Sequence, residues 1–418
     1  MTDYFRKCDK DVLRIIKKVG KVADRTGIDC YIVGGIVRDL VLGKKNLDLD
    51  IVLEGDAISF AKNVNEDFGG KLNTYDGFGT ASVILKNGFV VDFATARKER
   101  YAKPGALPTV RRGSLKDDLY RRDFTINALA ISIRKDSFGE LVDEFGGLRD
   151  IKSKKIRVLH DKSFIDDPTR ILRGVRFEQR FDFKFEQRTS ELLIRALEKR
   201  RERNVKAPRY FVEFKKLLAE NDPVKGLKRL KVLGGLDFLT GKNKISFVLM
   251  SNVHKNIIEI KKKDIFDNKN WWLIYFMSII KVLDDFTFNN ILGKFHFKKE
   301  EKVSILYSRE VELIIKRLSE KEILPSQVYE ILNRLNGDVV VFTRACSKSS
   351  LVSSRIDRYL TKDRNVKLSI TGKDLKAFGV ESGKRIGEIL ETVLYWKIDN
   401  NINLKREEIS LAKQLALL

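Results

Sequence analysis

The hydrophobic pattern of this chain changes once, near Asp150. Before that point, stretches with helical spacing alternate with short stretches of strand spacing, and from Ser163 onward nearly every segment has helical spacing. Such a change restricts the chain to a mixed α/β domain followed by helical domains. At 418 residues the chain is also too long for one ordinary hydrophobic core, so several compact units are expected.

The first part of the chain carries distinct signals for single helices and strands. Asp56 can cap a helix, Gly27 can end one, and Asn87-Gly88 is a strong hairpin signal. The expected helices cover residues 12–23, 36–42 and 57–68, and the expected strands cover residues 28–33, 47–52, 80–85 and 89–94. These elements predict a small mixed α/β domain.

Charge and cysteine content restrict the partners and the compartment. Lysine and arginine number 82 against 58 aspartate and glutamate, a formal net charge of +24, which favours a polyanionic partner over a basic surface that serves solubility alone. The three cysteines form no CxxC pair, which disfavours a disulfide scaffold or a zinc knuckle. The chain starts without the apolar core of a signal peptide, and its most apolar stretch, 271–280, is too short to span a membrane. We therefore expect a cytoplasmic protein with no membrane partner.

The segment Asp48-Leu49-Asp50 is the first candidate for chemistry. Residues i and i+2 of a strand point to the same face, so both carboxylates are expected side by side. They repel each other unless a cation lies between them, and Mg²⁺ shared with a triphosphate is suited to that place. Asp92 on the expected strand 89–94 is either a third carboxylate of this site or an ordinary surface residue.

Two further patterns favour anion binding. Gly34-Gly35 precedes a helix that carries Arg38 in its first turn, an arrangement suited to phosphate. Downstream of the paired Arg121-Arg122, a helix after Pro168 carries three arginines along one side, and their repulsion predicts an anion or acidic side chains opposite; these are Arg170, Arg173 and Arg176.

In this order and spacing, the motifs resemble the class II tRNA nucleotidyltransferases, the family of the CCA-adding enzymes and bacterial poly(A) polymerases, within the DNA polymerase β-like superfamily. The resemblance implies an α/β polymerase β-like head with a mixed sheet, followed by all-α neck, body and tail domains. The matching segments are Gly34–Asp39, Leu47–Asp50, Arg121–Ala128, Asp166–Phe177 and, more weakly, Ile370–Leu375. The implied boundaries are 1–147 for the head, 148–222 for the neck, 223–330 for the body and 331–418 for the tail.

The resemblance also implies a role for each motif residue. Asp48 and Asp50 would hold two Mg²⁺ ions, while Gly35, Arg38 and Arg122 would bind the nucleotide. Asp167 and Arg170 would imitate a base-pairing edge and select CTP or ATP without a nucleic-acid template, and the same site would extend to Arg173 and Arg176.

The implied RNA partner is tRNA, held through the phosphates of its acceptor and TΨC arms. The basic residues expected to hold it are Lys199, Arg200, Arg201, Arg203, Lys206 and Arg209, although a solvated basic face is an almost equal interpretation. The polar segment 97–119 resembles the family's flexible loop, which assists the switch from C to A addition.

The motifs alone leave the product of the reaction open. The main hypothesis is addition of CCA from CTP and ATP. The alternatives are a split-function enzyme that adds only A or only CC, a poly(A) polymerase, and a non-catalytic RNA-binding protein, which the intact Asp48 and Asp50 pair disfavours.

Overall fold

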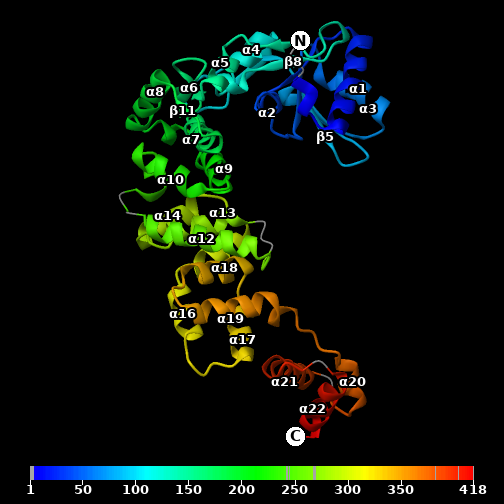
Figure 1. Cartoon of the computed structure of the whole chain (residues 1–418), viewed down its shortest axis with the longest axis vertical. Coiled ribbons are helices and arrows are strands. Elements are labelled where there is room, and N and C mark those ends of the chain that lie inside the picture. Colours follow the sequence, from blue (N-terminus) through cyan, green and yellow to red (C-terminus); the bar gives the residue numbers. More distant parts are fainter. Residues whose placement is uncertain are drawn as a thin grey trace. The chain divides into compact units, whose positions relative to one another are not determined.

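The computed structural model describes residues 4–241, 243, 245–266, 270–381, 383–402 and 404–417. The chain divides into two compact units, the first comprising Met1–Leu217 with Arg229–Phe238 and the second Leu218–Lys228 with Leu239–Leu418. The first unit contains the sheets and their helices, and every described element of the second is a helix (Figure 1). The predicted division into head, neck, body and tail is finer than these units and stays a prediction.

A mixed sheet of seven strands forms the centre of the head. The strand order is β3-β4-β5-β2-β1-β8-β9; β2 and β5 run parallel, and the other neighbours run antiparallel. The strands are β1 (Cys30–Val33), β2 (Leu49–Leu53), β3 (Lys71–Tyr75), β4 (Thr80–Ile84), β5 (Val90–Thr95), β8 (Ala130–Ser132) and β9 (Leu141–Val142). Two smaller sheets pair β6 (Arg97–Arg100) with β7 (Thr109–Arg112) and β10 (Lys155–Ile156) with β11 (Lys184–Phe185).

Helices cover the sheet and continue the chain beyond it. Helix α3 packs on β3, β4 and β5 and lies beside α1 (Figure 1). The helices up to residue 232 are α1 (Lys10–Thr26), α2 (Gly35–Val41), α3 (Ala57–Phe68), α4 (Leu115–Tyr120), α5 (Gly147–Lys152), α6 (Ser163–Asp166), α7 (Thr169–Phe181), α8 (Gln187–Glu198), α9 (Ala207–Leu218) and α10 (Pro223–Val232). Short 3-10 helices are η1 (Tyr4–Lys7), η2 (Asp76–Phe78), η3 (Thr125–Asn127), η4 (Lys135–Ser137) and η5 (Arg201–Asn204).

The remaining elements are α11 (Asp237–Thr240), α12 (Phe247–Lys262), α13 (Trp271–Ile280), α14 (Asp285–Lys294), α15 (Lys299–Tyr307), α16 (Val311–Leu318), α17 (Pro325–Asn333), α18 (Gly337–Cys346), α19 (Ser350–Thr361), η6 (Asp363–Asn365), α20 (Gly372–Ala377), α21 (Lys384–Asn400) and α22 (Lys405–Leu417). Helix α13, the most apolar stretch of the sequence, is buried from Leu273 to Ile280 and packs against α12 and α18. In the described part of the chain, none of the helices combines the length and apolarity needed to cross a membrane.

The observed head confirms the predicted fold class and most of its predicted elements. Asp56 caps α3 through the backbone N–H groups of Ile58 and Ser59, and Gly27 ends α1 with a φ of 67°. The hairpin around Asn87-Gly88 joins β4 to β5.

One expectation is wrong. Asp48 precedes β2 rather than lying in it, because its backbone N–H donates to Asn46 Oδ1 at 2.9 Å instead of entering the ladder. The segment 97–119, which resembles the family's flexible loop, contains an antiparallel hairpin of β6 and β7 followed by α4, and its role in the switch from C to A addition stays a prediction.

Candidate active site

One cavity of about 650 Å³ is lined by all nine residues that the sequence motifs assign to the metal or the nucleotide. Its wall combines side chains of the head with side chains of α7 and α9, all within the first unit. The predicted residues that line it are Gly35, Arg38, Asp48, Asp50, Arg122, Asp167, Arg170, Arg173 and Arg176. The fold thus brings together motifs that lie far apart in the sequence, and their individual roles stay predictions.

Carboxylates gather at the head end of the cavity. Asp48 and Asp50 line it, and Asp92 of β5 stands opposite Asp50 in the parallel register of β2 and β5. Burial, followed by the charges of Asp92 and Asp48, raises the pKa of Asp50 to about 6, against the opposing effect of Arg122. Ionised carboxylates crowded in this way are the donor set that a hard divalent cation would stabilise.

Asp92 differs from the other two in its surroundings. It accepts a hydrogen bond from the Ser82 hydroxyl and is not among the described residues that line the cavity. Within the described ranges, no group of three or more His, Cys, Asp or Glu side chains is arranged to hold a metal ion. Asp48 and Asp50 would therefore need oxygens from a bound molecule to complete a metal shell.

The glycine turn between β1 and α2 makes room for an arginine. Gly34 has a φ of 77°, and a Cβ at this position would lie 2.8 Å from Arg122 Nη1 and 4.0 Å from Asp50 Oδ2. A side chain here would force the end of the Arg122 side chain to move, and the positive φ itself favours glycine at this turn.

Arg38 lies beside this turn and is held by other side chains of the protein. The side chain is buried, donates to Asp39 at 2.9 and 3.0 Å and to Asn127 Oδ1 at 2.6 Å, and stacks 4.6 Å from the Phe181 ring. The same guanidinium is 3.6 Å from the position that a Cβ of Gly35 would occupy. Arg38 thus fixes the wall behind the glycine turn, and its contact with phosphate stays a prediction.

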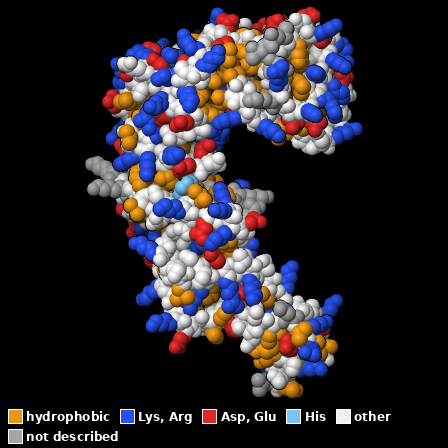
Figure 2. Space-filling model, in the orientation of Figure 1, with side chains coloured by type: hydrophobic (Ala, Val, Ile, Leu, Met, Phe, Trp, Pro, Cys, Tyr) orange, Lys and Arg blue, Asp and Glu red, His pale blue; other side chains and the backbone are white. Residues whose placement is uncertain are grey.

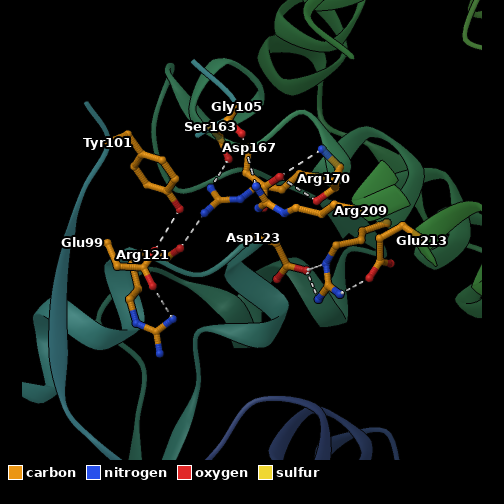
Figure 3. Close-up of polar contacts among 12 residues, drawn as sticks. Glu99, Tyr101, Gly105, Arg121, Asp123, Ser163, Asp167, Arg170, Arg209 and Glu213 are labelled. Carbon is orange, nitrogen blue, oxygen red and sulfur yellow. Dashed lines mark hydrogen bonds and ion pairs between the residues drawn. The ribbon is translucent and has the colours of Figure 1, made fainter. Parts of the chain in front are cut away.

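The paired arginines share one buried carboxylate. Arg121 donates to Asp118 at 2.6 and 2.9 Å, and Arg122 donates to the other oxygen of Asp118 at 2.9 Å. Although burial alone would raise the pKa of Asp118, the two guanidiniums lower it below its usual value. Arg121 also donates to Glu99 of β6 at 3.2 Å, and Glu99 accepts from Tyr101 at 2.9 Å (Figure 3). The hairpin is thereby tied to the arginine pair.

The expected acidic partners of the α7 arginines are present. Arg173 contacts Asp123 at 2.6 and 2.8 Å and Glu213 of α9 at 3.6 Å, and Arg176 lies 3.6 Å from Glu213. Arg170 is buried and donates to Ser163 Oγ and to the Arg121 carbonyl, each at 2.6 Å. The predicted acidic partners are therefore confirmed for Arg173 and Arg176, whereas Arg170 is held by a hydroxyl and a backbone carbonyl.

Asp167 has two sets of partners at the start of α7. One oxygen accepts from the Thr169 backbone N–H at 3.1 Å and from its hydroxyl at 2.7 Å, and the other lies 2.8 Å from Arg209 Nη2. Arg209 also donates to the Gly105 carbonyl at 3.4 Å, while Gly105 N–H donates to the Asp166 carbonyl at 3.2 Å (Figure 3). The tip of the hairpin is therefore docked on the same corner as Asp167.

The position of Arg209 corrects one expectation. The sequence placed Arg209 among the contacts to tRNA phosphates, but its ion pair with Asp167 puts it in the wall of the cavity. The other members of that basic set with exposed side chains are Lys199, Arg200, Arg203 and Lys206.

Three acidic residues of the site are not predicted from the sequence, and they are Asp118, Glu99 and Glu213. The ion pairs of Asp118 could have been predicted, because Asp118 precedes Arg121 and Arg122 by three and four residues, the spacing of neighbours on a helix. Glu99 and Glu213 give no such signal, since the site arginines that they contact lie far from them in the sequence.

We predict that Asp123→Ala strongly destabilises the first unit. Asp123 is buried, and although burial alone would raise its pKa, Arg173 and Asn127 hold the pKa at about 2. Removal leaves Arg173 with an incomplete set of partners, which costs roughly 3–5 kcal/mol of unfolding free energy. This stabilisation is present above the unfolded pKa of about 3.9 and is lost as the pH falls from there to about 2.

Urea unfolding at neutral pH checks this prediction. The matched control is Asp161→Ala, which removes an exposed ion pair with Arg188 and should leave the free energy of unfolding almost unchanged. A loss for Asp123→Ala no larger than that of the control would contradict the assignment.

Comparison with known proteins identifies the family. Residues 30–157 match the model of the poly A polymerase head domain. The A-adding tRNA nucleotidyltransferase of Halalkalibacterium halodurans is 33% identical, over 97% of this chain and 92% of its own length. This chain belongs to the tRNA nucleotidyltransferase family. The resemblance inferred from the sequence motifs is thereby confirmed.

Two further relatives of this tRNA nucleotidyltransferase differ in length and activity. The A-adding tRNA nucleotidyltransferase of Geobacter sulfurreducens is 35% identical over 98% of this chain, which spans only 48% of that relative's length. The solved structure of the Thermotoga maritima CCA-adding enzyme complexed with tRNA is 34% identical, with a TM-score of 0.74 over 98% of this chain and 96% of that one. Its relatives therefore include both A-adding and CCA-adding enzymes.

Proposed function

We propose that this chain extends the 3′ end of tRNA with C and A residues from CTP and ATP and releases pyrophosphate. The observation that carries the proposal is the single cavity that joins Asp48 and Asp50 of the head to Asp167 and Arg170 at the start of α7. One end supplies carboxylates for phosphate chemistry, and the other supplies an acceptor and a donor fork for a base edge.

Selection of the base follows from the groups at the α7 end. A carboxylate has about four acceptor positions, and Thr169 and Arg209 occupy three of those on Asp167. An acceptor therefore remains for the exocyclic amine that C and A carry on the pairing edge and U lacks. Arg170, fixed by Ser163 and the Arg121 carbonyl, presents its guanidinium to the same cavity. We propose that this pair selects the nucleotide.

The triphosphate would occupy the head end. Gly35, Arg38 and Arg122 line the wall next to the carboxylates, so phosphate can approach the glycine turn closely. Asp48 and Asp50 would hold two Mg²⁺ ions together with phosphate oxygens, a set of hard ligands that fits this cation. When bound, the ions would neutralise the phosphates and lower the pKa of the attacking hydroxyl.

In the reaction, the 3′ oxygen of the RNA forms a bond to the α-phosphorus, and the bond to the β-phosphate oxygen breaks. The residues of the cavity contribute mainly by position and charge. Arg122, fixed by Asp118 beside the Gly34 turn, faces the carboxylates and would contact the nucleotide's phosphates. Asp167 and Arg170 at the start of α7 would hold the base so that the α-phosphate lies next to the 3′ end of the RNA.

Basic side chains support binding to tRNA. Lys and Arg side chains are spread over the visible face of both units rather than gathered in one patch (Figure 2). Together with the net charge of +24, this distribution favours contacts to many phosphates along a folded RNA. Exposed Lys199, Arg200, Arg203 and Lys206 are our candidates for the acceptor and TΨC arms.

A second candidate is addition of the terminal A alone, which the A-adding relatives at 33% and 35% identity favour. The test uses three tRNA substrates, which lack CCA, CA or only the final A, with CTP, ATP or both. We expect CTP to extend the substrates that lack CCA or CA, and ATP to complete the substrate that lacks only A. An A-only enzyme would extend only the substrate that ends in CC. A failure to extend any of them, or a long A tail on many RNAs, would contradict the proposal.

A further inference from the structure

The catalytic cavity continues into a second groove to which the proposed reaction assigns no role. This groove has a volume of about 380 Å³ and lies between η2 and β7. It shares Phe78, Arg97 and Val110 with the cavity of Asp48 and Asp50, so the two adjoin along a common wall. A molecule lying in the groove would therefore reach the cavity that Asp48 and Asp50 line.

An exposed aromatic ring lies at this junction. Phe78 is the last residue of η2 and is 61% exposed, and Leu107, 72% exposed, lines the same cavity from the tip of the β6–β7 hairpin. Gly79 ends η2 with a φ of 58°, which keeps the turn short and leaves the ring at the rim. An unburied phenylalanine beside a charged site offers a stacking face for a base, worth roughly 5- to 150-fold in affinity for single-stranded nucleic acid.

Cationic side chains line the groove beyond the ring. Arg111 and Arg112 of β7 are exposed, and Arg112 has only a 4.0 Å contact with Asp56. Arg97 donates to Glu99 at 3.1 Å, while its Nε is buried with no hydrogen-bond partner. The Asp56 carboxylate already accepts hydrogen bonds from the backbone N–H groups of Ile58 and Ser59 at the start of α3. The groove therefore presents donors suited to the phosphates of a strand.

We propose that Phe78 stacks on the 3′-terminal base of the RNA to be extended, and that Arg111 and Arg112 contact the phosphates that precede it. The inference rests on the proposed function. The attacking 3′ oxygen must approach the α-phosphate opposite the leaving pyrophosphate. Since the nucleotide would lie between the Gly34 turn and the Asp167 corner, the wall at Phe78 is left for the RNA end.

The direct test is a tRNA whose last base is 2-aminopurine, a base whose fluorescence is quenched by stacking. With the full chain we expect quenching on binding, and with Phe78→Ala we expect the quenching to be lost. The variant should also lower kcat/KM for the RNA by roughly 5- to 150-fold, with KM for the nucleotide unchanged. Phe78→Trp should restore both readouts.

The matched control is Tyr75→Ala, because Tyr75 on β3 is 53% exposed and is not among the described residues that line either cavity. It should behave as the wild type. Arg111→Gln and Arg112→Gln should each reduce the salt slope of RNA binding by about 0.7.

Failure of this inference is distinguishable from failure of the proposed function. If the wild type extends tRNA while Phe78→Ala keeps full quenching and activity, the stacking role is overturned. Unchanged salt slopes would likewise remove RNA phosphates from the groove and leave it to a partner of another class. A wild type that extends no tRNA would instead overturn the proposed function.

Discussion

Replacement of Asp48 or Asp50 by alanine is expected to reduce nucleotide addition by at least roughly 10²–10³-fold, the loss typical when one electrostatic group of an active site is removed. Both carboxylates line the cavity, and the raised pKa of Asp50 reports a charge that its surroundings do not neutralise. Single-turnover extension of tRNA measures the loss. Asp11→Ala, which removes an exposed carboxylate of α1, is the control and should have no effect.

The same variants should keep or slightly raise the free energy of unfolding in the absence of metal. The folded pKa of Asp50, about 6, lies above the unfolded value near 3.9, so its ionisation costs stability as the pH rises through this range. Removal of the Asp50 carboxylate therefore removes the cost of keeping it ionised at neutral pH, and removal of Asp48 relieves part of the repulsion on Asp50. Variants that keep most of their turnover would contradict the metal assignment, and a loss of the same size in Asp92→Ala would add Asp92 to the metal site.

Asp167→Asn is expected to change which nucleotide is used more than how fast the best one is used. Asparagine still accepts the hydrogen bonds from Thr169 at the start of α7, because its side-chain oxygen is an acceptor like that of aspartate. It replaces one carboxylate oxygen by an amide that donates, so the acceptor for the exocyclic amine is lost. An unpaired group of this kind costs about 1–3 kcal/mol, or roughly 5- to 150-fold in selectivity.

Single-turnover addition with each of the four nucleoside triphosphates measures this change. We expect the preference for CTP and ATP over UTP and GTP to shrink by that factor in Asp167→Asn. Arg38→Ala is the comparison variant and should weaken all four nucleotides alike, since its place is beside the phosphate end. Wild-type selectivity in Asp167→Asn would assign the carboxylate to capping α7 alone.

The local elements of the head follow from signals that lie within a few residues of each other. Gly27 and Asp56 end and begin helices through their own backbone and side-chain bonds, and Asn87-Gly88 sets its hairpin, so these features are predictable from the sequence. The predicted strand position of Asp48 is wrong, because the alternation of apolar and acidic residues alone extends the strand to it. The backbone N–H of Asp48 donates to the side chain of Asn46, and the ladder of β2 begins one residue later, at Leu49.

The hairpin of β6 and β7 shows what periodicity cannot supply. Arg97–Arg100 is entirely charged and has no apolar alternation, so a segment of this composition is indistinguishable from a loop. The structure orders it through contacts from afar, among them the bond from Arg121 to Glu99 and the docking of Gly105 against the Asp166 carbonyl. Such contacts depend on the tertiary fold.

The residues of the candidate site also differ in whether the sequence predicts them. Asp48, Asp50 and the α7 arginines belong to compact motifs, and the cavity contains all of them. Arg209 has no such motif, and in the sequence it is one basic residue among several near the start of α9. Its ion pair with Asp167 arises only because α9 folds back on the start of α7.

The central claim is that the protein itself selects the nucleotide, in one cavity and without a nucleic-acid template. Competitive equilibrium binding of ATP, CTP, GTP and UTP to the full chain, with Mg²⁺ present and RNA absent, tests it most directly. We predict that ATP, CTP or both bind more tightly than UTP and GTP, and that Asp167→Asn abolishes this difference. Equal binding of all four nucleotides by the wild type would contradict the claim.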